Sequence, residues 1–75
     1  MTIRFSRHAI RRMKLYRIPV SVVREILEQL LPEDGRHEII RPIEGFPFPI
    51  KIVVSVERTV QHIVTAYPLK KGGKT

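Results

Sequence analysis

The chain has 75 residues, and a protein of this size buries only about 60% of the surface that its unfolded form exposes. We therefore expect one domain with a thin core that favours a homodimer. Fourteen Lys and Arg against seven Asp and Glu give a net charge of +7, which favours a polyanionic partner such as RNA or another nucleic acid.

The composition also excludes several classes of protein. No cysteine is present, so disulfide bonds and thiolate metal sites are ruled out. The longest apolar runs are about four residues, too short for a membrane span, and the N-terminus lacks the apolar segment of a signal peptide. We expect a cytoplasmic protein without membrane contact.

The first half of the chain has the pattern of two helices. Ser6 is a favoured N-cap residue, and apolar side chains at spacings of three and four predict a helix over residues 6–16. These apolar residues are Phe5, Ala9, Met13 and Tyr16. Pro19 disfavours a helical conformation at Ile18 and suits the start of a second helix, predicted over residues 19–30 from its broad apolar stripe.

The second half has the pattern of extended chain. Strands are predicted over residues 36–43, 50–57 and 60–69, the last two joined by a tight connection. Pro42 cannot donate a hydrogen bond to a neighbouring strand, so it indicates an edge strand or a strand end. The prolines that follow Phe46 and Phe48 hold these residues extended, and their rings either cover the core or stack on a ligand.

Together these elements predict an α+β domain over residues 1–69, with two N-terminal helices packed on a three-stranded antiparallel sheet in the order ααβββ. A flexible basic tail is expected at residues 70–75. The register of the last hairpin stays open. An even-length connection places Thr65 and Tyr67 on the face of Val54 and Val56, and an odd one places them on the other face.

The sequence does not support two other kinds of site. The tail KKGGKT lacks the first glycine of a phosphate-binding P-loop, because Pro68 stands in its place. His8, His37 and His62 are far apart in sequence and lack metal-ligand spacing, so no metal site is predicted. His37 and His62 each alternate with apolar residues, as surface or packed histidines of a strand do.

The segment SRHAIRRMKLYR, residues 6–17, places one histidine among five cationic side chains. A solvated helix face is the plain interpretation. However, no acid separates the cations, and Arg7 lies in the first helical turn, where the helix dipole disfavours positive charge. We therefore expect an external anion, most simply a nucleic-acid phosphate. The predicted phosphate-binding residues are Arg7, Arg11, Lys14, Arg17, Arg41 and Lys51.

His8 is the group of this segment that exchanges a proton near neutral pH, and the cations around it disfavour its imidazolium form, which suits a general base. Arg12 lies one turn away and can stabilise negative charge on a phosphate, while a hydroxyl of Thr65 or Tyr67 can orient the phosphate or donate to the leaving oxygen. RNA supplies its own nucleophile, the 2′-hydroxyl, so these groups suffice for cleavage without a metal or cofactor.

The opening FSRHAIRRMKLYRIPVSVVREIL and the ending VTAY, residues 64–67, resemble small bacterial domains of unknown function. Those domains share the pattern F-[ST]-x-H-A-x-x-R-M-x-x-R-x-I and a T-V-Y-like last strand, and they are similar to the RelE-like ribonucleases of the barnase, EndoU, colicin and RelE group. The resemblance implies a RelE-like fold and a metal-independent endoribonuclease of toxin type. It carries over His8, Arg12, Thr65 and Tyr67 as the active site. Ala66 departs from the usual bulky β-branched residue.

Two other functions fit the same residues. A non-catalytic nucleic-acid-binding module would grip phosphates through the first helix and the basic strands without cutting, and its binding would not depend on His8. A partner-binding module would dock an acidic, antitoxin-like protein, for which an exposed hairpin edge and a thin core are suited.

Overall fold

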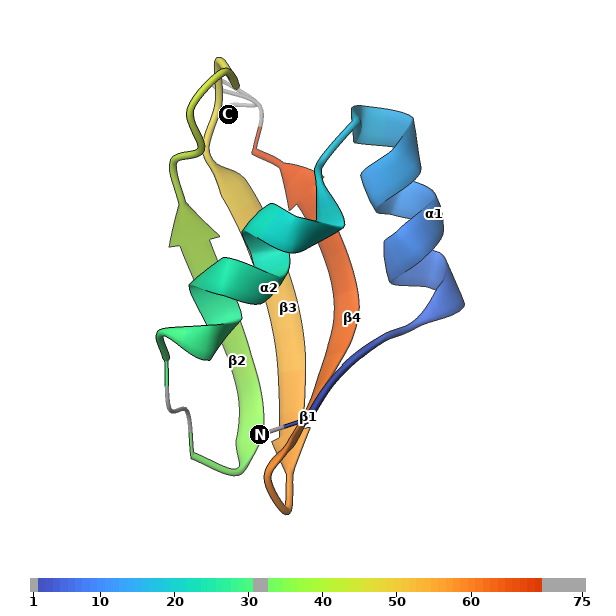
Figure 1. The fold of residues 1–75 in the computed structure, drawn as a ribbon, viewed down its shortest axis with the longest axis vertical. Helices are drawn as coiled ribbons and strands as arrows, with labels where there is room; N and C mark the ends of the chain where they lie inside the picture. Colours follow the sequence, from blue (N-terminus) through green and yellow to red (C-terminus); the bar gives the residue numbers. More distant parts are fainter. Residues whose placement is uncertain (1, 31–32, 70–75) are drawn as a thin grey trace.

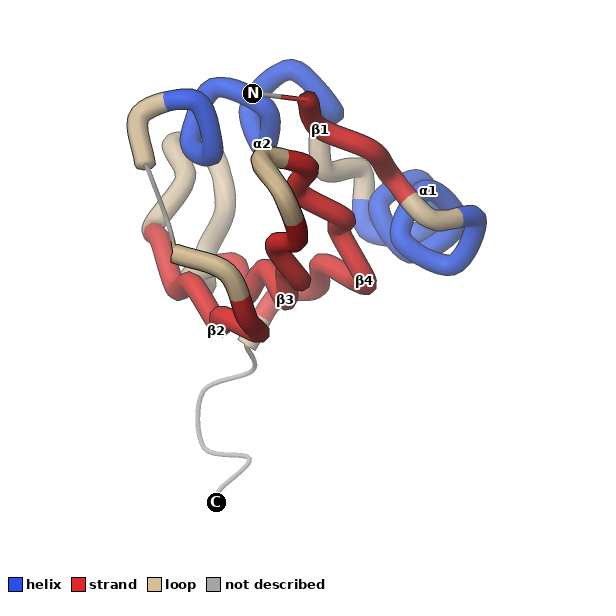
Figure 2. Tube along the Cα trace, turned by 90° about the horizontal axis from the view of Figure 1, so that it is seen from below, coloured by secondary structure: helices blue, strands red, loops and turns tan. Residues whose placement is uncertain are grey.

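The computed structural model describes residues 2–30 and 33–69, so the predicted basic tail lies outside the described residues. The elements are β1 (Thr2–Phe5), α1 (Arg7–Tyr16), α2 (Val20–Glu28), β2 (Gly35–Arg41), β3 (Ile50–Glu57) and β4 (Val60–Pro68). The strands form one sheet in the order β1-β4-β3-β2. α2 crosses one face of this sheet and α1 lies alongside β4 (Figure 1). No helix of the described chain lies over the other face (Figure 2).

The N-terminal strand β1 corrects the predicted fold. The α+β class and both helices are confirmed, but the sheet has four strands instead of three and is mixed instead of antiparallel. β1 pairs in parallel with β4, with Thr2 opposite Val60 and Phe5 opposite Ile63. Phe5 therefore belongs to a strand and not to the apolar stripe of the first helix. Residues 2–5 do alternate between exposed and half-buried positions, but four residues are too few to stand out beside a strong helical pattern.

Both ends of α1 follow from local sequence. Ser6 Oγ accepts a hydrogen bond from the Ala9 amide at 2.9 Å, which confirms it as the N-cap. Arg17 ends the helix in a left-handed conformation with φ 58°, and the Ile18 amide donates to the Met13 carbonyl oxygen at 2.8 Å. α2 begins after Pro19, as expected.

The strands also lie close to their predicted bounds. β2 ends at Arg41, directly before Pro42, as the missing amide of proline requires. β3 and β4 are joined by Arg58 and Thr59, whose φ values of 51° and 64° are those of a two-residue type I′ turn. The tight connection is therefore confirmed, and it has an even length.

A bulge in β4 then changes the face of the sheet on which Thr65 and Tyr67 lie. Val54 pairs with Ile63, but its neighbour Val53 pairs with Thr65, which leaves Val64 as an extra residue. The extra residue moves Thr65 and Tyr67 to the face away from Val54, although the connection is even. Neither alternative drawn from the sequence included a bulge.

The core lies between the two helices and the covered face of the sheet. Phe46 and Tyr16 pack against its margin, so covering the core is the confirmed role of the Phe46 ring. The Gln61 side chain is also buried, and its Nε2 donates to the Leu27 carbonyl oxygen at the end of α2, at 3.4 Å. The fully buried apolar residues are Ala9, Met13, Val23, Leu27, Ile50, Ile52, Val54, Ile63 and Ala66.

Replacing Ser6 by alanine is expected to lower the free energy of unfolding by about 1 to 2 kcal/mol, because it removes the acceptor that caps α1. Urea denaturation followed by circular dichroism measures this difference. Ser21→Ala changes an exposed serine of α2 and is expected to cost less than about 0.5 kcal/mol. Equal losses in the two variants would show that the cap does not support the fold.

Candidate nucleic-acid interface

The face of the sheet that carries no helix, called the open face below, has a mainly polar surface. The strand registers decide which side chains lie on it. Most of them are exposed or half-buried, and the apolar Val53 lies buried among them. The polar residues of the open face are Thr2, Arg4, Arg36, Glu38, Lys51, Ser55, Glu57, His62, Thr65 and Tyr67.

An ion pair crosses the open face between β2 and β3. Lys51 Nζ lies 3.0 Å from Glu38 Oε1, and no other ion pair is formed within residues 2–30 and 33–69. The hydrogen bond to Glu38 raises the pKa of Lys51, desolvation opposes this effect, and the charge of Glu38 and the neighbouring Tyr67 act in the raising direction. Lys51 was predicted to bind phosphate. In the structure its positive charge is partly balanced by Glu38, so less of that charge is available to a phosphate.

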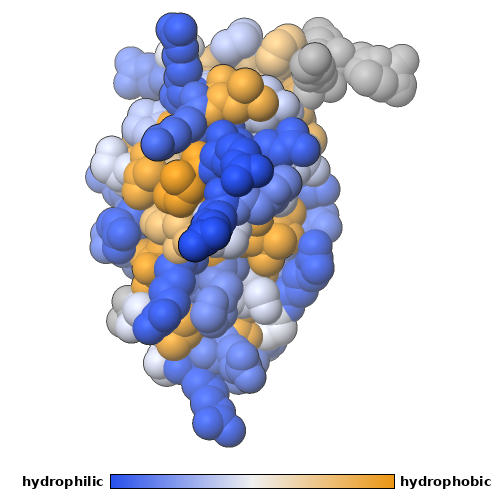
Figure 3. All heavy atoms as spheres, turned by 90° about the vertical axis from the view of Figure 1, so that its right-hand side faces the viewer, coloured by the Kyte–Doolittle hydropathy of each residue, from blue (hydrophilic) through white to orange (hydrophobic). Residues whose placement is uncertain are grey.

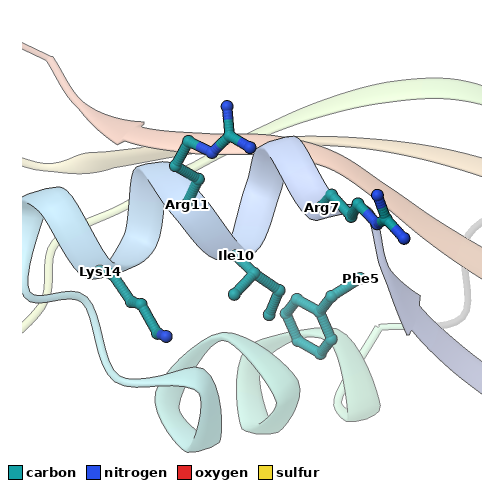
Figure 4. Close-up of a pocket in the computed structure, with 5 residues that line it drawn as sticks. All are labelled: Phe5, Arg7, Ile10, Arg11 and Lys14. Carbon is teal, nitrogen blue, oxygen red and sulfur yellow. The ribbon is translucent and has the colours of Figure 1, made fainter.

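Helix α1 has one flank that faces α2 and one flank that faces away from it. Ile10 and Lys14 point from α1 toward α2 (Figure 4). His8 and Arg12 each precede one of these residues by two positions, which places them about 160° around the helix. They therefore project away from α2, on the side of the open face. Both are exposed. Arg12 Nη1 donates to Tyr16 Oη at 3.5 Å.

The start of α1 is fastened to the bulge of β4. The Ser6 amide donates to the Ile63 carbonyl oxygen at 3.1 Å, and Ser6 Oγ donates to the Val64 carbonyl oxygen at 3.0 Å. His8 follows Ser6 by two residues, and Thr65 follows Val64 directly. The residues predicted as catalytic thus lie on two joined elements, with His8 and Arg12 on α1 and Thr65 and Tyr67 on β4.

The predicted phosphate-binding residues do not form one surface. Arg7, Arg11 and Lys14 line a hollow on the flank of α1 that faces α2. Arg17 is exposed at the end of α1, and Arg41 is exposed at the end of β2. Viewed from the α1 side, hydrophilic side chains cover much of the surface and apolar patches are exposed between them (Figure 3).

Three basic side chains of the open face, Arg4, Arg36 and His62, were absent from the predicted site. Arg4 pairs with His62 across β1 and β4, and both are exposed. The signal for Arg4 was its alternation with Ile3 and Phe5, which only becomes informative once β1 is recognised. His62 behaves as the predicted surface histidine. His37 is half-buried, with Nε2 2.5 Å from the Glu33 carbonyl oxygen.

Comparisons with known proteins add no second source of evidence. No protein-family model, curated protein or solved structure matched the chain. The described part of the chain contains no group of three or more His, Asp or Glu side chains arranged to hold a metal ion. Nor does it contain a helix long and apolar enough to cross a membrane.

Changing Glu38 to glutamine is expected to lower the pKa of Lys51, because Glu38 is the main cause that raises it. An NMR titration of the lysine ammonium group measures this pKa directly. Since the folded-state pKa is raised, the pair stabilises the fold at neutral pH, and this contribution is lost as the pH rises through the pKa of Lys51.

The matched control is Glu28→Gln, which removes the same charge from an exposed position of α2, on the covered side of the sheet. It is expected to leave the titration of Lys51 unchanged. A pKa that moves equally in both variants would mean that net charge, and not the Glu38 pair, sets its value.

Proposed function

We propose that this protein is a metal-independent endoribonuclease of the RelE-like group, which binds RNA along α1 and the open face of the sheet. One observation carries the proposal: the bulge at Val64 turns Thr65 and Tyr67 outward on the strand to which Ser6 fastens α1. An imidazole and a guanidinium on α1 and two hydroxyls on β4 thus occupy exposed or half-buried positions of two elements that Ser6 joins.

The proposed reaction uses the RNA itself as nucleophile. His8 takes the proton of the 2′-hydroxyl, and the resulting oxygen attacks the adjacent phosphorus. Arg12 stabilises the negative charge that grows on the phosphate oxygens. The bond from phosphorus to the 5′-oxygen then breaks, and the 5′-oxygen takes a proton. The products are a 2′,3′-cyclic phosphate and a 5′-hydroxyl.

Tyr67 is the better candidate for the proton donor. Its cross-strand neighbour is Lys51, whose ammonium group can hold the phosphate while the phenol donates its proton. Thr65 stands one step nearer to the bulge and is assigned to orient the phosphate through its hydroxyl. The sequence alone did not separate these two roles.

The charges of the open face fit a single strand of RNA. Arg4, Arg36 and His62 are exposed there and have no ion pair in the described part of the chain. Contacts from such side chains to phosphates release counterions, so binding is expected to weaken steeply with salt. DNA can occupy the same surface but lacks the 2′-hydroxyl that the reaction needs.

A second function, RNA binding without cleavage, is favoured by one observation. The His8 ring is exposed, and no hydrogen bond to another described residue holds it in place. A general base is commonly oriented by such a partner. In that case the same surface binds RNA, and His8 contributes contact but no proton transfer.

The two functions are separated by incubating single-stranded RNA with the protein in the presence of EDTA. The wild type is expected to release products with 2′,3′-cyclic phosphate ends and to leave a 2′-O-methyl RNA of the same sequence intact. His8→Ala is expected to lower the cleavage rate by about 100-fold or more, since general base catalysis contributes at least that much. RNA affinity should stay close to that of the wild type.

His37→Gln provides the matched control, because His37 bonds to Glu33 and does not lie on the open face. It is expected to cleave at the wild-type rate. If the wild type binds RNA in a salt-dependent manner without cleaving it, the non-catalytic function is correct. Full cleavage by His8→Ala would remove His8 from the mechanism.

A further inference from the structure

A hollow of about 360 Å³ lies on the α2-facing flank of α1 and is separate from the proposed RNA surface. Its lining comes from the end of β1 and from α1 (Figure 4). The ring of Phe5 and the side chain of Ile10 lie next to each other above α2, and the ammonium group of Lys14 points toward α2. Arg7 extends outward beside the end of β1, and Arg11 extends from α1 on the side away from α2.

The hollow combines an apolar floor with a cationic rim. Phe5 and Ile10 are only half-buried, so part of their apolar surface meets solvent. Arg24 of α2 adds another cation, with its guanidinium carbon 5.6 Å from the centroid of the Phe5 ring. None of the cations around the hollow forms an ion pair within the described residues, where the single pair joins Lys51 to Glu38.

We propose that this hollow binds an acidic peptide segment of a partner protein, with one apolar side chain of the segment seated on Phe5 and Ile10. Carboxylates on either side of that apolar residue would pair with Arg7, Arg11 and Lys14. The acidic segment complements the charge of the four cations around the hollow, Arg7, Arg11, Lys14 and Arg24, none of which forms an ion pair within the described residues. Burying one leucine-sized side chain contributes about 1.5 to 3 kcal/mol to binding.

The same features argue against a nucleic acid in this hollow. A base binds best on an unobstructed aromatic face, but Arg24 already lies over the Phe5 ring. Ile10 offers an aliphatic surface, which suits a leucine or valine side chain better than a base. Phosphates alone would leave the apolar floor exposed. The proposal therefore assigns α1 a second ligand, of a different class, on the flank opposite His8 and Arg12.

The test measures binding of a fluorescein-labelled peptide in which one leucine stands between two pairs of glutamates, by fluorescence anisotropy with the full-length protein. A second peptide carries serine in place of the leucine. The leucine peptide is expected to bind about tenfold more tightly or better, as burial of its side chain requires. Equal binding of the two peptides would overturn the proposed apolar contact.

Four variants test where the peptide binds. Lys14→Glu and Arg11→Glu are each expected to weaken the leucine peptide by about tenfold or more. Arg36→Glu makes the same charge change on β2, outside the hollow, and is expected to change binding by less than about threefold. Ile10→Ser is expected to abolish the preference for leucine over serine, with its fold checked by circular dichroism.

Two results would contradict the proposal. If Arg36→Glu weakens the peptide as strongly as Lys14→Glu, the peptide responds to net charge and the hollow is not its site. If a single-stranded RNA of five nucleotides displaces the leucine peptide and its own binding depends on Ile10 and Lys14, the hollow is a nucleic-acid site. Peptide binding is measured without RNA cleavage, so failure of the ribonuclease proposal leaves this test unaffected.

Discussion

The hydroxyl of Ser6 makes two hydrogen bonds on which the arrangement of the molecule depends. It accepts from the Ala9 amide, which starts α1, and it donates to the Val64 carbonyl oxygen, which lies at the bulge of β4. One side chain thus fixes the beginning of the helix and fastens it to the place where the strand changes register. Without the bulge, Thr65 and Tyr67 would face the core, where unpaired hydroxyls are costly.

Because the core is small, two flanks of α1 stay open to ligands. The helix buries only Ala9 and Met13 fully, which is a narrow stripe. One flank faces α2 and carries the hollow, and the other carries His8 and Arg12. This arrangement explains how one short helix holds so many cations. Their mutual repulsion goes unrelieved by any acidic residue in α1, and external anions on two sides would relieve it.

The sequence predicted the features that depend on neighbouring residues, and it missed those that depend on distant ones. The Ser6 cap, the end of β2 before Pro42 and the Arg58–Thr59 turn each follow from a few adjacent residues. By contrast, β1 is recognisable only through its parallel pairing with β4, 58 positions away. The bulge has no distinct signature, because Val64 is one of several similar residues in a β-branched strand.

In the candidate site, too, the sequence predicted what depends on neighbouring residues and missed what depends on distant ones. Residue types and positions on α1 were predictable from helical spacing, but the flank on which each cation lies depends on where α2 packs. The pairing of Glu38 with Lys51 depends on the register between β2 and β3, which an eight-residue connection does not determine. The sequence therefore grouped cations that the fold divides between the open face, the hollow and the ends of elements.

The central claim is that the bulge joins the outward hydroxyls of β4 and the His8 flank of α1 into one RNA-binding surface. An NMR titration with a 2′-O-methyl RNA, which cannot be cleaved by its own 2′-oxygen, tests this claim most directly. The largest amide shifts are expected on His8, Arg12 and residues 62–67, while α2 stays unaffected. Shifts centred on α2 and the hollow, with none near Thr65, would contradict it.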